Sequence, residues 1–333
     1  MLANKSPGLL QLFRKNIFLN SLLLIPYAFF LHLGVWLRKV PIESQEANWI
    51  FNQSFGRLSI SYEWNLVLSV ILITMEALLI NRIVIQYRLN PNGQLFGGIF
   101  FILFCGFHSD TLLLSAPLVG NLFFLFALLQ LFSIYQKKHS PIALFNVGFF
   151  IGLASLFYVP FYIFLFLGII GLMVLKGFQF REMFQIIIGF GVLYFLSFSI
   201  FYFLNLHELF LNIQIGGFFK PYLFSMVLGS KGWIAFSILL ILMLVCLVQF
   251  GLFQSRQTIL LQKYYDLLFW TSFISMFSIF FLQVKEISHL ILWITPLAFL
   301  VGLVMSKIKN QLIAETIHLI FVVTALFLQF QNW

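Results

Sequence analysis

Apolar runs long enough to cross a lipid bilayer recur along this chain from Ile17 to Phe330, separated by short polar breaks. Of the 333 residues, 62% are hydrophobic and only 9% are charged, whereas soluble domains carry about 25% charged residues. A soluble protein of this size must cover its surface with polar groups, and this chain has too few of them. The sequence therefore predicts an all-α, polytopic transmembrane helical bundle that forms a single integral membrane domain over residues 1–333.

Eleven apolar segments are predicted to span the membrane, because each approaches the roughly 20 residues that a spanning helix needs. Most of the 19 lysines and arginines fall in the segments on the side of the N-terminus, so the positive-inside rule predicts an N-in/C-out orientation in a bacterial inner membrane. The expected spans are residues 17–37, 65–86, 95–107, 116–135, 142–158, 161–176, 184–204, 232–252, 267–282, 289–306 and 312–330.

The net charge of +9 comes from basic residues that sit at the ends of these spans. Their position indicates membrane topology and excludes nucleic acid as a partner, leaving membrane lipid as the expected contact. Cys105 and Cys246 both lie inside apolar runs, which favours buried small side chains. They are far apart in the sequence, so the chain contains no CxxC metal motif.

The acidic residues have the opposite bias, since most of those outside the spans fall in segments predicted to face outward. Acidic residues contribute little to membrane topology, so insertion does not require this asymmetry. The outer face is therefore where we look for chemistry.

The first outer segment, residues 41–55, alternates apolar and polar residues in near-helical spacing. This pattern predicts a short amphipathic interfacial helix anchored by Trp49. Glu43 and Glu46 are three residues apart and would share one face. They form either a solvated acidic edge or a pair of carboxylates held over a cavity at membrane level.

A second polar group, His108-Ser109-Asp110, lies in the tight outer turn between the third and fourth spans. Either Asp110 caps the following helix, or His108 and Asp110 face the same cavity as the acids of the first segment. A short turn at a helix start is a rigid place to hold a carboxylate.

Residues 205–231 form a third outer segment, rich in aromatic residues and glycine, which is typical of an interfacial loop. His207 and Glu208 begin it and are candidate substrate-binding residues. Lys220 either extends its ammonium group toward the headgroups or contacts a phosphate, and Arg57 in the first outer segment is a second candidate for that contact.

Ionisable residues also occur at membrane depth, where they are costly and face the bundle interior or water. Glu315 and His318 form a Glu-x-x-His pair, as do Glu286 and His289, but the two pairs begin at opposite membrane faces, so they cannot share a dimetal site. We expect structural roles for them, and no metal site is predicted. The groups at membrane depth are His32, Glu76, Glu315 and His318.

Several of these features together resemble the polytopic glycosyltransferases of the GT-C class, which use polyprenyl-phosphate sugars. Gln45-Glu46-Ala47-Asn48-Trp49 occupies the position of that class's acidic motif, and Asp110 that of its second acid. The basic residues 136–141 resemble the hinge before its short Gly-rich spans. The resemblance covers roughly residues 10 to 205 and divides the chain into a GT-C-like core module, residues 1–205, and additional C-terminal spans, residues 206–333.

The resemblance implies transfer of a sugar from a polyprenyl-phosphate donor at the outer face. The leading acid of the family motif is Gln45 here, and an amide cannot act as the general base. Glu46 or Glu43 would then deprotonate the acceptor, while Asp110 would orient it or hold a divalent metal ion. Lys220 or Arg57 would contact the lipid phosphate.

Two alternatives remain open. Gln45 also fits a catalytically inactive GT-C-like scaffold or subunit with membrane-protein partners, and Glu76 and Glu315 fit a transporter or lipid flippase. The Phe-, Ile- and Lys-rich composition is similar to that of multi-span inner-membrane proteins of Bacteroidota, which implies no function.

Overall fold

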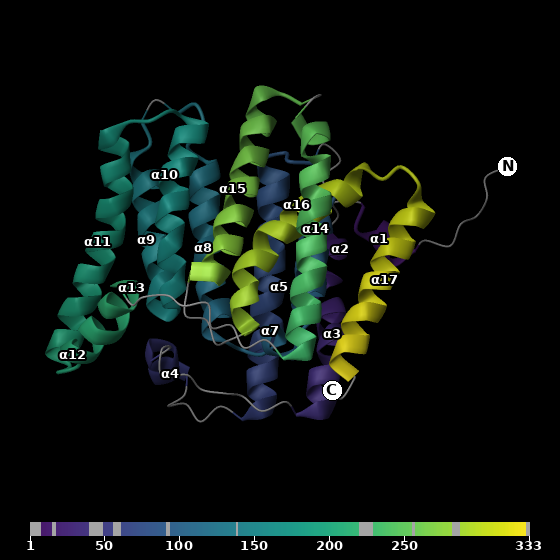
Figure 1. Ribbon diagram of the computed structural model, residues 1–333, viewed down its shortest axis with the longest axis horizontal. Coiled ribbons are helices and arrows are strands. Elements are labelled where there is room, and N and C mark those ends of the chain that lie inside the picture. Colours follow the sequence, from purple (N-terminus) through teal and green to yellow (C-terminus); the bar gives the residue numbers. More distant parts are fainter. Residues whose placement is uncertain are drawn as a thin grey trace.

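The computed structural model describes residues 8–14, 18–39, 49–55, 61–90, 94–137, 139–219, 229–254, 257–281 and 287–330. Over these residues the chain is helical and contains no strand (Figure 1). In chain order the elements are α1 (Leu9–Leu12), α2 (Phe18–Leu22), α3 (Leu24–Arg38), α4 (Trp49–Phe55), α5 (Tyr62–Gln86), α6 (Phe96–Cys105), α7 (Ser109–Leu112), α8 (Ala116–Phe132), α9 (Pro141–Phe157), η3 (Val159–Ile163), α10 (Phe164–Leu175), α11 (Phe180–Phe203), α12 (His207–Leu209), η4 (Phe210–Ile215), α13 (Gly216–Phe219), α14 (Ser230–Gln254), α15 (Ile259–Phe281), η5 (Ile287–Leu290), α16 (Ile291–Lys307) and α17 (Gln311–Phe330).

Six of the described helices are long and apolar enough to cross a membrane, by length and composition. In a helix the backbone N–H and C=O groups hydrogen-bond to one another within the same segment. This matters in a bilayer, because its hydrocarbon core contains no water to bond to them. The prediction of an all-helical protein with several membrane-length helices is confirmed. The six segments are Asn20–Arg38, Tyr62–Gln86, Phe180–Phe203, Ser230–Gly251, Ile287–Lys307 and Gln311–Phe330.

The count of eleven spans stays a prediction. Each predicted segment overlaps a helix, but four of the apolar helices are only 10–17 residues long. The short ones are Phe96–Cys105, Ala116–Phe132, Pro141–Phe157 and Val159–Leu175. Of the first outer segment, Trp49–Phe55 form the short helix α4, whose Ile50 packs on a small apolar cluster with Leu156, Tyr194 and Phe210. That this helix lies at the membrane interface stays a prediction.

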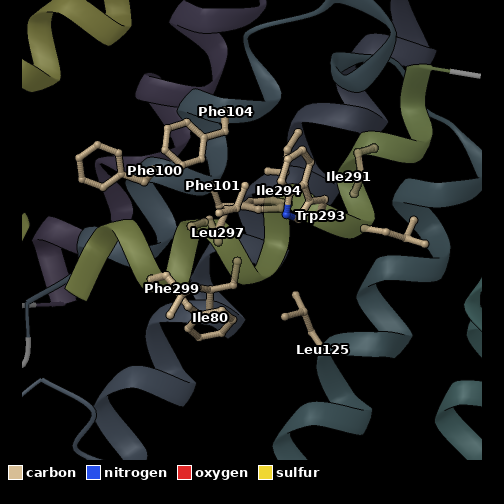
Figure 2. Close-up of a cluster of buried hydrophobic side chains, with 14 of the residues drawn as sticks. Ile80, Phe100, Phe101, Phe104, Leu125, Ile291, Trp293, Ile294, Leu297 and Phe299 are labelled. Carbon is tan, nitrogen blue, oxygen red and sulfur yellow. The ribbon is translucent and has the colours of Figure 1, made fainter. Parts of the chain in front are cut away.

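The middle of the bundle is α16, which the other helices surround. Of its apolar stretch, 89% is buried inside the protein, against 22% to 50% for the other five membrane-length segments. It packs on α6, α8, α14 and α15. Figure 2 shows Ile291, Trp293 and Leu297 of α16 among phenylalanines of α6 such as Phe101.

Close approach of α16 and α6 depends on two glycines. A Cβ at Gly302 would lie 2.8 Å from the backbone nitrogen of Gly97. The hydrophobic core likewise contains residues from both sides of position 205. The two parts of the chain that the resemblance separates therefore pack into one core.

The bundle has two ends, which we name after short helices that mark them (Figure 1). The α7 end carries α4, α7, α12 and the last turn of α17. The α1 end carries α1, the last turn of α16 and the start of α17, where the amides of Leu10 and Gln11 donate to the Glu315 carboxylate over 3.2 and 3.0 Å. Glu315 therefore has the structural role that we expected, since it holds α1 to α17.

Glycines also set the spacing of α9 and α11. A Cβ at Gly148 would lie 1.8 Å from the carbonyl oxygen of Ile186, and one at Gly189 would lie 2.1 Å from the carbonyl oxygen of Phe145. Small residues permit such backbone contact between membrane helices. Gly148 and Gly189 therefore let α9 and α11 pack backbone against backbone.

We expect Gly148→Ala to destabilise the protein by about 1–3 kcal/mol, because α9 and α11 must separate to admit the methyl group. Gly191→Ala is the matched control, since a Cβ at Gly191 on α11 meets nothing within 4 Å. Thermal unfolding in one detergent measures both. Equal melting temperatures for the two variants would contradict the packing that we describe.

Candidate functional site

Four of the eight predicted site residues lie outside the described residues: Glu43, Glu46, Arg57 and Lys220. The other four are His108, Asp110, His207 and Glu208, and all of them lie at the α7 end (Figure 1).

His108 and Asp110 form a compact polar turn at the start of α7. His108 is the N-cap residue, and its Nδ1 accepts a hydrogen bond from the Asp110 backbone N–H over 3.2 Å. Of the two alternatives, capping by Asp110 is not observed, because Ser115 is the N-cap residue of α8 and the His108 imidazole fills the N-cap position of α7. Asp110 is left with a side chain that is 42% exposed, with Oδ1 3.7 Å from His108 Nδ1.

One hydrogen bond within this turn and two buried ones from neighbouring helices fix it. The Thr111 hydroxyl donates to the His108 carbonyl over 2.7 Å. The Leu112 carbonyl lies 3.1 Å from Nε2 of His32 on α3, and the Leu114 N–H donates to Oδ1 of Asn65 on α5 over 3.2 Å. Asp110 is thus presented on a rigid support, which is what a carboxylate needs to orient a bound group.

Two cations are linked electrostatically to this turn through His108. Lys231 at the start of α14 is near enough to act electrostatically on His108, and Arg38 at the end of α3 acts on Lys231. The Arg38 guanidinium lies 5.6 Å from the centre of the Phe330 ring. We call His108, Asp110, Lys231 and Arg38 the α7-end cluster. Sequence reasoning missed the last two as site residues, because they border spans and serve equally well as topology signals.

Burial lowers the pKa of the His108 imidazole below its usual value of 6.5. The Asp110 carboxylate opposes this effect and Lys231 adds to it. We infer a neutral imidazole at neutral pH, because Nδ1 must carry a lone pair to accept the Asp110 N–H. A neutral His108 does not form an ion pair with Asp110. Its ring caps α7 through the Asp110 backbone N–H, and the Asp110 carboxylate lies beside it.

His207 and Glu208 lie elsewhere on the same end. They form α12, which packs on α11 and η4, whereas α7 packs on α3, α5 and η5. The His207 ring lies 5.2 Å from the Tyr202 ring. The structure therefore gives no support to one site containing both predicted pairs.

Glu76 lies inside the bundle in a network that joins three helices. Asn121 on α8 donates to Glu76 Oε2 on α5 over 2.8 Å, and Thr295 on α16 donates to Asn121 Oδ1 over 2.8 Å. All three side chains are fully buried. Asn121 and Thr295 were missed as partners, although each is a rare polar residue in an apolar run.

Buried histidines have similar linking roles. His289 lies 2.9 Å from the Tyr158 hydroxyl and 2.9 Å from the Ser278 hydroxyl, and His318 lies 3.0 Å from the Tyr27 hydroxyl. Among the described residues, no three histidine, cysteine, aspartate or glutamate side chains gather in a way that could hold a metal ion.

No family model matches the chain, and neither a curated protein nor a solved structure matches it. The function must therefore be argued from the site itself.

The lowered pKa of His108 predicts a pH effect on stability. The unfolded chain binds a proton at His108 near pH 6.5, whereas the folded protein does so only at lower pH. The stabilisation by the neutral cap is therefore complete above pH 6.5 and is lost as the pH falls through the folded pKa. We expect the melting temperature of the wild type to fall more steeply below about pH 6.5 than that of His108→Asn.

Asparagine is the matched replacement at His108, because it caps helices well and does not titrate. The other histidines are present in both proteins, so the difference in slope isolates His108. Parallel pH profiles would show that burial does not affect His108 in this way.

Proposed function

We propose that this protein acts in lipid-linked glycan assembly, transferring a sugar from a polyprenyl-phosphate donor at the membrane face where the α7 end lies. The observation that carries the proposal is the half-exposed carboxylate of Asp110, fixed on a rigid turn whose His108 is acted on by the charge of Lys231. This is the position at which the GT-C class places its second acid.

Three members of the α7-end cluster act in this reaction, and His108 holds the turn that carries Asp110. The Asp110 carboxylate accepts a hydrogen bond from the acceptor hydroxyl and orients it. The hydroxyl gives its proton to Glu46 or Glu43, its oxygen bonds the anomeric carbon, and the bond to the lipid phosphate breaks. Lys231 and Arg38 stabilise the charge that develops on the departing phosphate.

The proposal includes eleven spans, an N-in/C-out orientation and placement in a bacterial inner membrane. The distribution of charge supports this orientation, because the α1 end carries the larger share of the described basic residues. The α7 end would then face outward, where polyprenyl-linked donors of this class are used.

The test compares Asp110→Asn with Glu63→Gln in the host membrane, with lipid-linked glycans measured by mass spectrometry. Glu63 is the matched control, because it is an exposed acid at the start of α5, at the same end of the bundle. We expect Asp110→Asn to lower sugar transfer about 10²-fold, the cost of a poorly placed reactant, and Glu63→Gln to leave it unchanged.

A melting temperature for each purified variant shows whether it is folded. If folded Asp110→Asn and the double variant Glu43→Gln/Glu46→Gln both keep the wild-type glycan profile, the enzymatic proposal is wrong. The inactive scaffold that Gln45 suggests would then be the better description, and co-purification would be expected to return a membrane partner.

A further inference from the structure

The α1 end contains a cavity of about 370 Å³ that lies between segments far apart in the sequence. Arg14 follows α1, Asn90 and Gln94 lie between α5 and α6, and Tyr265 belongs to α15. The end of α16 completes the wall with residues 306–309. A cavity of this size suits a small ligand or a headgroup.

The charged residues in the described lining of this cavity are basic. Arg14, Lys307 and Lys309 line it, and no aspartate or glutamate is among its described lining residues. Arg14 is oriented by a hydrogen bond from Nη2 to the Ile308 carbonyl over 3.2 Å, and its guanidinium lies 5.9 Å from the centre of the Phe96 ring. An oriented guanidinium loses less entropy when it binds an oxyanion.

The floor of the cavity is polar although it is buried. Asn90 and Gln94 are 5% and 4% exposed, and the Asn90 amide donates to Gln94 Oε1 over 3.5 Å. The Tyr265 hydroxyl donates to the Leu89 carbonyl over 2.8 Å. Amide groups at this depth can bond to the oxygens of an anion that the cations attract.

Glu315, the acid at this end of α17, is not among the described residues that line the cavity. Glu315 already accepts hydrogen bonds from the amides of Leu10 and Gln11, which keep it against α1. The described lining of the cavity therefore combines three basic side chains with buried polar groups.

We propose that this cavity binds a phosphate group, carried either by an anionic lipid headgroup or by a free phosphate compound. Arg14 supplies paired N–H donors that match two phosphate oxygens, while Lys307 and Lys309 act as point charges. Basic pockets between membrane helices near the membrane surface have this recognition chemistry. The inference is independent of sugar transfer at the α7 end, because the two sites lie at opposite ends of the bundle.

The experiment compares the double variant Lys307→Gln/Lys309→Gln with Lys137→Gln/Arg181→Gln. The second pair is the matched control, because it also removes two exposed charges but lies outside the cavity. Each protein is placed in nanodiscs of phosphatidylcholine, with or without phosphatidylglycerol. Native mass spectrometry measures retained phosphatidylglycerol, and melting curves at fixed ionic strength measure stabilisation by inorganic phosphate or pyrophosphate.

We expect the cavity variant to lose about tenfold in affinity relative to the wild type and the control, since each lysine contributes modestly near a charged ligand. A difference with phosphatidylglycerol identifies a lipid headgroup as the source, and a difference with phosphate or pyrophosphate in pure phosphatidylcholine identifies a soluble compound. Either result supports the site. Equal binding by the cavity variant and the control in both assays, with equal melting temperatures in phosphatidylcholine alone, would overturn it.

Discussion

A helix with almost no lipid contact, α16, determines how the rest of this protein is arranged. Because its apolar stretch is 89% buried, other helices must enclose it, and the glycine contact with α6 and the Thr295–Asn121 hydrogen bond fix its neighbours. Its two ends lead to the two candidate sites. At one end η5 packs on α7, and at the other residues 306–309 form a wall of the basic cavity. A shift in the position of α16 would therefore change the packing at both ends of the bundle.

The helical class and the positions of the helices could be predicted, because long apolar runs have few other stable solutions in a bilayer. How deeply each helix is buried in the bundle could not be predicted. The segments Ile287–Lys307 and Gln311–Phe330 have similar mean hydropathies of 2.1 and 1.9, yet 89% of one and 22% of the other is buried. Burial of this kind depends on which helices surround a segment, and composition carries no record of that arrangement.

The two candidate sites could also be predicted only in part from the sequence. His108 and Asp110 could be found because they are adjacent in the chain, but the sequence did not reveal that the imidazole caps α7 and leaves the carboxylate exposed. Arg14 and Lys307 meet at one cavity although nearly the whole chain separates them. Each was interpreted only as a signal of topology. Basic residues at helix ends can serve insertion and ligand binding together, so charge counting alone does not distinguish these roles.

The proposed function requires that Asp110 lie outside the membrane, and Lys309, at the opposite end of the bundle, must then lie inside. Single substitutions Asp110→Cys and Lys309→Cys in intact cells, treated with a membrane-impermeant maleimide, measure this directly. Cys105 and Cys246 are buried, so the native background is low. The account predicts that the protein with Asp110→Cys is labelled in intact cells and that the protein with Lys309→Cys is labelled only after the membrane is opened. Labelling in the reverse order, or of both variants in intact cells, would contradict it.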